Sequence, residues 1–144
     1  MKCCRKCNVE LVIGENITQA KWNNYDFICK KCFYKESRVY TKRRLQKMRD
    51  ESQPGVYGIY YEDELVYVGE SSHCEYRFWD HKHTHQSTKS YIGLNKSYIQ
   101  DYSQKIFKEE KDERLRKQLE MELIVKHKPC LNYPYREDGY IHNP

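Results

Sequence analysis

The chain has 144 residues, of which 38% are hydrophobic, 14% are aromatic and 33% are charged, with a net charge of +5. It contains no run of 18 apolar residues, which excludes a transmembrane helix, and its first ten residues lack the apolar stretch of a signal peptide. We therefore expect either one modest domain or a small module joined to a compact domain.

The charge is unevenly distributed along the chain. Residues 1–53 hold 13 Lys and Arg against 6 Asp and Glu, and residues 54–144 hold 13 against 15, so the net charges are +7 and −2. A basic segment ahead of a near-neutral one is typical of a nucleic-acid anchor attached to a separate working domain. A merely solvated surface gives the same imbalance, whereas a module that binds only other proteins is disfavoured by it.

Two Cys-x2-Cys pairs lie near the N-terminus, Cys4 with Cys7 and Cys29 with Cys32, and 21 residues separate them. Each pair can present two thiolates to one ion, and four thiolates are the ligand set of a structural Zn²⁺. We expect residues 1–36 to form a Cys4 zinc-binding module, with a redox pair or unrelated thiols as the alternatives. Cys3 could replace Cys4, because Cys3-x3-Cys7 is also a possible spacing.

Residues 37–53 form a basic connector without Gly or Pro, and we expect a helix that leaves the second cysteine pair and runs to about Met48. The cations that can contact phosphates, over more than one face, are Lys42, Arg43, Arg44, Lys47 and Arg49. Phosphate contacts give affinity and salt dependence but little sequence choice. The alternative is a solvated linker helix. The stretch SQPG then marks the boundary of the next domain.

Residues 54–144 predict a small α+β domain that opens with an antiparallel hairpin. The runs GVYGIYYE and ELVYVG are rich in β-forming residues and are bounded by Gly. A helix should follow, capped by Ser71 or Ser72 and running to about His85, which would align Arg77, His81 and His85 on one stripe.

The rest of this domain predicts a third strand and a last helix. Residues 91–104 are compatible with a short helix, and KIFKE at 105–109 predicts an edge strand. The last helix should be capped by Asp112 and stopped by Pro129. The expected fold is a three-stranded antiparallel sheet flanked by helices, preceded by the treble-clef-like Cys4 module and the basic helix.

Several residues of this domain resemble the GIY-YIG nuclease family, in the order that the family shows. Gly55-Val56-Tyr57 matches the GIY element and Tyr67-Val68-Gly69 the YIG element, each with Val for Ile, which is a conservative β-branched change. Gly58-Ile59-Tyr60 is the less favoured register, because it leaves too short a stretch before the second element. The family's helical arginine, histidine and glutamate and its later asparagine fall on Arg77, His81, Glu120 and Asn132. The resemblance covers about residues 54–133, and the cysteine module resembles the fingers attached to phage and mobile-element nucleases.

The resemblance implies a divalent-metal-dependent DNA endonuclease whose catalytic residues are Tyr57, Tyr67, Arg77, His81 and Glu120. Phosphodiester hydrolysis needs a base for water, and either the Tyr57 phenol or the His81 imidazole could serve. Arg77 would stabilise charge on the phosphoryl oxygens, and Glu120 would bind one Mg²⁺ or Mn²⁺. Each of these residues, considered alone, also has a structural explanation. A tyrosine on a strand can pack against neighbouring side chains, and an arginine or glutamate on a helix can form an ion pair or be exposed to solvent.

Three further motif residues have structural roles in this reading. Gly55 and Gly69 belong to the two strand signatures, and Gly69 would let the backbone pass close to the site. Asn132 would tie the exit of the last helix to the sheet.

The expected partner is DNA, with no membrane, and the expected state is a monomer or a transient homodimer on DNA. Size and the appended finger suggest a homing-type enzyme of a bacteriophage or mobile element, in the bacterial or phage-infected cytoplasm. The alternatives are a catalytically inactive DNA-binding or regulatory protein, a structure-selective repair nuclease, and a restriction-like dimer.

Overall fold

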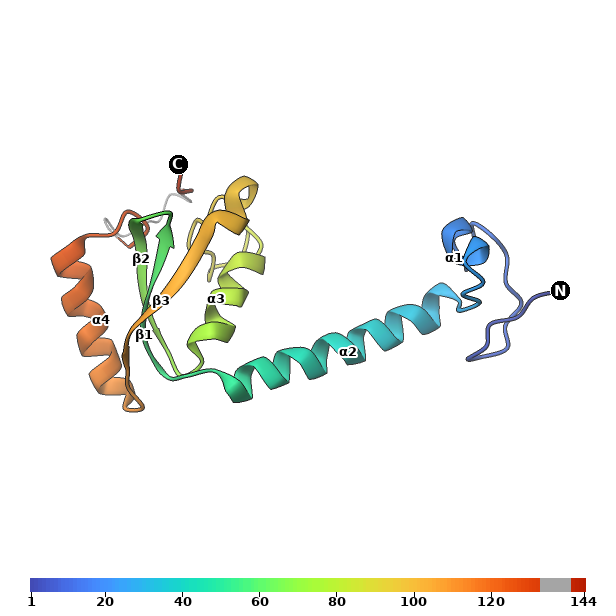
Figure 1. The fold of residues 1–144 in the computed structure, drawn as a ribbon, viewed down its shortest axis with the longest axis horizontal. Helices are drawn as coiled ribbons and strands as arrows, with labels where there is room; N and C mark the ends of the chain where they lie inside the picture. The colour runs from blue at the N-terminus through green and yellow to red at the C-terminus, as the bar shows by residue number, and fades with distance from the viewer. Residues whose placement is uncertain (133–140) are drawn as a thin grey trace. The chain divides into compact units, whose positions relative to one another are not determined.

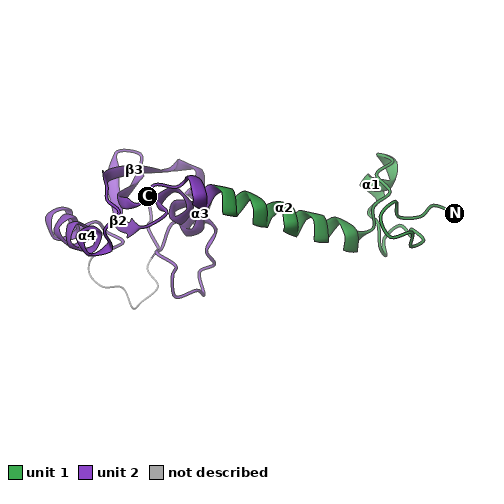
Figure 2. Cartoon of the chain, turned by 90° about the horizontal axis from the view of Figure 1, so that it is seen from below, with its two compact units in different colours: residues 1–47 green, residues 48–144 purple. Residues whose placement is uncertain are grey.

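The computed structural model describes residues 1–132 and 141–144 (Figure 1). The chain forms two compact units, residues 1–47 and 48–144, which are coloured separately in Figure 2. Among the described residues, no helix has both the length and the apolar character needed to cross a membrane.

The first unit contains a short helix, α1 (Gln19–Asn23), and most of a long one, α2 (Lys30–Glu51). Thr18 caps α1, since its hydroxyl accepts a hydrogen bond from the Lys21 amide. The buried side chains of this unit form one small cluster, which consists of Cys4, Leu11, Ile17, Ile28 and Cys29. So few apolar residues cannot stabilise a module of this size alone, and two of the five are members of the cysteine pairs.

The second unit is built on a three-stranded antiparallel sheet. Its strands are β1 (Gly55–Tyr61), β2 (Glu64–Ser71) and β3 (Tyr102–Glu109), in the order β2-β1-β3. The expected hairpin and the expected edge strand are both confirmed, although β3 begins at Tyr102 and not at Lys105. β1 is therefore central, and its first five residues are buried.

Helices flank this sheet, and Figure 1 shows the sheet between α3 (Cys74–His83) and α4 (Glu113–His127). A 3-10 helix at Lys96–Asp101 precedes β3 and fills the region where a short helix was expected. The fold class predicted for this domain is thus confirmed.

Helix α4 has the expected limits. The Asp112 side chain accepts a hydrogen bond from the Leu115 amide and caps its start. The helix ends at His127, and Lys128 adopts a left-handed conformation directly before Pro129.

The predicted cap of α3 is wrong. Ser71 belongs to β2, where it pairs with Gly55, and the residue that precedes the helix is His73, which makes no side-chain capping bond. The helix also ends earlier than expected, at His83. His85 lies outside it, and the predicted helical stripe is reduced to Arg77 and His81.

The core of the second unit consists of buried side chains from the sheet, from α3 and from the loops around it: Tyr57, Ile59, Val66, Cys74, Leu94, Tyr102 and Leu131. The last described residues also pack here, since the His142 amide donates to the Gly93 carbonyl and its Nδ1 lies 2.7 Å from the Tyr102 hydroxyl.

Candidate active site and four-cysteine cluster

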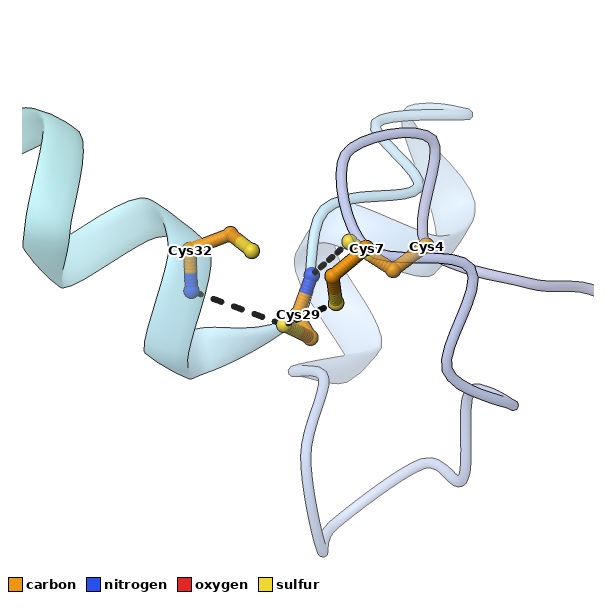
Figure 3. Close-up of side chains that lie close together, drawn as sticks. All are labelled: Cys4, Cys7, Cys29 and Cys32. Atoms are coloured by element: carbon orange, nitrogen blue, oxygen red, sulfur yellow. Dashed lines mark hydrogen bonds between the residues drawn. The ribbon is translucent and has the colours of Figure 1, made fainter.

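The four paired cysteines converge in the first unit (Figure 3). The sulfurs of Cys4, Cys7, Cys29 and Cys32 all lie within 4.8 Å of one another, and those of Cys7 and Cys29 are 3.7 Å apart. Four thiolates at about 2.3 Å from a tetrahedral Zn²⁺ would be about 3.8 Å apart, so the cluster has the size that this ion requires. Cys3 is exposed and lies outside the cluster, which answers the Cys3 or Cys4 alternative in favour of Cys4.

Backbone amides favour negative charge on one of these sulfurs, that of Cys4. The Cys29 amide donates to Cys4 Sγ at 3.3 Å and lowers the pKa of the Cys4 thiol to about 6. Hydrogen bonds with the thiols of Cys7 and Cys29 instead raise the pKa of Cys32 to about 12. Four thiolates this close repel one another, and a bound dication would remove that repulsion.

In the second unit, three rings from three different elements meet. Tyr57 on β1 is 1% exposed, and its hydroxyl oxygen lies 2.9 Å from Nε2 of His81 on α3. Tyr67 on β2 joins them, with its ring centre 6.4 Å from that of Tyr57 and 5.4 Å from that of His81. The structure therefore brings together three of the five predicted catalytic residues in direct contact.

The two motif glycines are explained by close approaches. A Cβ on Gly69 would lie 2.7 Å from the Tyr57 hydroxyl oxygen and 2.7 Å from a ring carbon of Tyr67, so a side chain there would displace the site. A Cβ on Gly55 would fall on the Lys108 carbonyl oxygen of β3. The absence of a side chain at Gly69 thus leaves room for the Tyr57 hydroxyl, and the absence of one at Gly55 leaves room for the backbone of β3.

The strand register decides between the two candidate tyrosines. Alternate side chains of a strand point to opposite faces, so Tyr60 lies on the face of β1 opposite to Tyr57. There it contacts the Phe107 ring, and the Lys105 ammonium lies 4.7 Å from its ring centre. Only the reading with Gly55-Val56-Tyr57 places a tyrosine beside His81.

Burial controls the protonation of these three groups. It raises the pKa of Tyr57 well above the ordinary value, and it raises the pKa of Tyr67 to about 12. Burial also lowers the pKa of His81 to about 3, helped by the positive charges of Arg77 and Lys96. At neutral pH both phenols carry their protons and the imidazole is uncharged, so it can accept a proton. Its Nδ1 is buried and has no hydrogen-bond partner among the described residues.

Arg77 and Glu120 act on this cluster through their charges. Arg77 lies on α3 one turn before His81, forms an ion pair with Asp80, and lowers the pKa of both Tyr57 and Tyr67. Glu120 lies on α4, and its Oε1 accepts a hydrogen bond of 3.1 Å from the Glu70 amide. Burial and the Glu70 carboxylate raise the pKa of Glu120.

The donor set around Glu120 suits a hard divalent cation. Mg²⁺ is usually bound by one or two carboxylates and takes its other ligands from water and phosphate. The Glu120 carboxylate meets that requirement, since it is oxygen-based, fixed by a backbone amide and electrostatically coupled to Tyr57 and Tyr67.

Asn132 holds β2 through its side-chain amide. Its Oδ1 accepts from the Val68 amide at 2.7 Å, and its Nδ2 donates to the Val68 carbonyl at 2.8 Å. This two-point contact has the tying role that the sequence predicts for Asn132.

No pattern in the sequence indicated three residues that support the site, which are Glu70, Lys96 and Arg116. Arg116 is buried, and its Nε donates to Glu70 Oε2 at 2.8 Å, which holds Glu70 beside Glu120. Lys96 donates to the Lys82 carbonyl at 2.6 Å, near the end of α3. Arg116 and Glu70 are 46 residues apart, and no local pattern indicates such a pair.

The predicted DNA-binding cations, Lys42, Arg43, Arg44, Lys47 and Arg49, all lie on α2 and are exposed. The Arg49 guanidinium lies over the Tyr76 ring and donates to the Tyr76 hydroxyl at 2.8 Å. The other four lie in the first unit, farther along the helix whose first turn contains Cys32.

Neither a protein-family model nor a curated protein matches this chain. Two solved structures are similar to it, both of the GIY-YIG N-terminal endonuclease domain of UvrC from Thermotoga maritima. Each is a point mutant in which a phenylalanine replaces a tyrosine, and each is described as bound to a catalytic divalent cation. The identities are 19% and 20%, each match covers 62% of this chain and 94% of the other, and both TM-scores are 0.39.

Proposed function

We propose that this protein is a divalent-metal-dependent DNA endonuclease of the GIY-YIG type. The observation that carries the proposal is the contact between the Tyr57 hydroxyl and His81 Nε2 at 2.9 Å, beside Tyr67 and within the fields of Arg77 and Glu120. A phenol, an imidazole, a guanidinium and a carboxylate are the groups that activate water and stabilise a phosphoryl group.

In the proposed reaction a water molecule attacks phosphorus in line with the leaving oxygen, so that one P–O bond forms as the P–O bond to that oxygen breaks, and the leaving alkoxide takes a proton from solvent water. The Tyr57 oxygen takes the proton of that water as its own proton passes to His81 Nε2, so the pair accepts one proton in all. An anionic phosphate beside His81 raises the pKa of the imidazole, while Arg77 lowers that of the phenol, and substrate binding thereby brings the two values together.

The other residues bind and orient the substrate. Arg77 donates to the non-bridging phosphoryl oxygens, where negative charge increases in the transition state. Tyr67 orients the water or the phosphate with its hydroxyl. Glu120 would hold Mg²⁺ or Mn²⁺, and such an ion supplies Lewis-acid stabilisation and a lower pKa for bound water.

The four cysteines would hold one structural Zn²⁺, and the zinc module with α2 would anchor the enzyme on DNA. The basic N-terminal third and the small buried cluster around Cys4 and Cys29 support both roles. The small size and the appended finger favour a homing-type enzyme of a bacteriophage or mobile element, which would act in the cytoplasm as a monomer or as a transient dimer on DNA.

The test is plasmid cleavage with and without Mg²⁺ by the wild type, Tyr57→Phe, Glu120→Gln and Tyr60→Phe. Tyr60→Phe is the matched control, because it removes a strand hydroxyl from the opposite face of β1. We expect metal-dependent cutting that Tyr57→Phe and Glu120→Gln abolish and that Tyr60→Phe retains. A wild type that binds DNA but never cuts it, with or without metal, would reject the enzyme in favour of an inactive DNA-binding protein.

A further inference from the structure

The cations of α2 are not spread evenly around the helix. Successive residues of an α-helix are about 100° apart, so Lys31, Lys35, Arg38 and Lys42 fall within a sector about 60° wide. All four are exposed, and α2 has no buried residue. We call these four residues the basic stripe.

The basic stripe carries no negative charge. Glu36 is the one acidic residue between Lys30 and Lys47, and it lies about 140° from Lys31 on the helix. Its carboxylate is paired with the Lys6 ammonium at 2.9 Å. Within the described residues, none of the four stripe cations forms an ion pair, so their charge is available to an external anion.

The remaining cations of α2 point elsewhere. Arg43, Arg44 and Lys47 lie about 120–160° from Lys31, on other faces of the helix. Arg43 lines a groove beside the cysteine cluster, and Lys35, at the edge of the basic stripe, lines the same groove. Arg49 is in register with Lys31, but its guanidinium already contacts Tyr76.

We propose that the basic stripe binds consecutive phosphates along one strand of duplex DNA. This proposal rests on the proposed function, and it narrows the predicted DNA contacts to one face of α2. Lys31 and Lys42 are about 16 Å apart along the helix axis at 1.5 Å per residue. One DNA strand rises about 3.4 Å per phosphate while it also winds around the duplex axis, so a straight stripe of this length can reach roughly three consecutive phosphates of that strand. Contacts with phosphates position the DNA without selecting a sequence.

Two triple variants on the same helix test this proposal. The stripe variant is Lys35→Ala with Arg38→Ala and Lys42→Ala, and the control variant is Arg43→Ala with Arg44→Ala and Lys47→Ala. Both remove three positive charges, and Ala favours the helix in both. Affinity for a labelled 30-base-pair duplex is measured by fluorescence anisotropy over a range of salt concentrations. The buffer contains neither Mg²⁺ nor a chelator, so that DNA is not cut and bound zinc is retained.

We expect the slope of log affinity against log salt to become shallower by about 2.7 in the stripe variant, at about 0.9 per lost phosphate contact, and by less than about 1 in the control. Equal changes in the two variants, or no change in either, would overturn the proposal. The proposed function is tested by a separate measurement. If the wild type does not cut plasmid with Mg²⁺, the endonuclease activity is rejected, while the two salt slopes still show whether the basic stripe binds DNA.

Discussion

Replacing Gly69 by Ala tests whether the Tyr57–His81 contact is the reacting pair. The new Cβ would lie 2.7 Å from the Tyr57 hydroxyl oxygen and 2.9 Å from the carbon that bears it, whereas ordinary contacts begin near 3.4 Å. Tyr57 must therefore retreat by about 0.7 Å, because β2 is fixed by its pairing with β1. Overpacking of this size costs about 1–3 kcal/mol of folding free energy, and a displacement of about 1 Å in a reacting group costs about a hundredfold in rate.

Gly58→Ala provides the matched control on the opposite face of the same hairpin. A Cβ at Gly58 would lie 2.7 Å from a Leu65 methyl and 2.8 Å from the Phe107 ring, which are side chains away from the Tyr57 hydroxyl. We expect urea denaturation to show a similar loss of stability in the two variants, about 1–3 kcal/mol. Plasmid cleavage, measured where both variants are folded, should fall about a hundredfold in Gly69→Ala and less than about threefold in Gly58→Ala.

Comparison of the two variants distinguishes an effect on the cleavage reaction from an effect on folding stability. Full cleavage by Gly69→Ala would refute the assignment of Tyr57 to the reaction. Equal losses of cleavage in both variants would mean that any strain in the hairpin disables the site, and the close approach at Gly69 would then have no special role.

Asn132→Ala should cost about 1–3 kcal/mol in urea denaturation, because it removes both hydrogen bonds to Val68, and an unchanged midpoint would contradict the tying role. Cys29→Ser should release one Zn²⁺ per chain and unfold the zinc module while the sheet domain stays folded, and retention of stoichiometric zinc would reject that ligand. His81 is uncharged in the folded state down to about pH 3 but is protonated below about pH 6.5 when unfolded, so acid favours unfolding. Stability should therefore fall as the pH drops from 6.5 towards 3, and His81→Gln should flatten that dependence in urea titrations.

Local signals in the sequence were sufficient for much of this fold. The hairpin was predicted from alternating β-forming residues, and α4 was predicted from the Asp112 cap and the Pro129 stop, because each signal acts within a few residues. The cysteine cluster was predicted for a related reason, since a Cys-x2-Cys turn fixes two ligands at once.

The parts that could not be predicted depend on partners that are distant in the sequence. Ser71 resembles a helix cap, but its pairing with Gly55 extends β2 and moves the start of α3 to Cys74. Arg116 reads as one more cation on a charged helix, yet its bond to Glu70 is buried and supports the site. Such roles follow from the packing of α4 on the sheet, which no local pattern encodes.

Strand β2 connects the two halves of the proposed site. Gly69 lies against the Tyr57 hydroxyl, and its two neighbours are held by residues of α4 and of the segment that follows α4. Val68 is bound at its amide and carbonyl by Asn132, and Glu70 is bound at its amide by Glu120 and at its carboxylate by Arg116. A movement of α4 would therefore shift the proposed metal-binding carboxylate and the strand that positions the tyrosine together. The same contacts hold the proposed base and the proposed metal ligand at fixed positions relative to each other, which an in-line displacement at phosphorus would require.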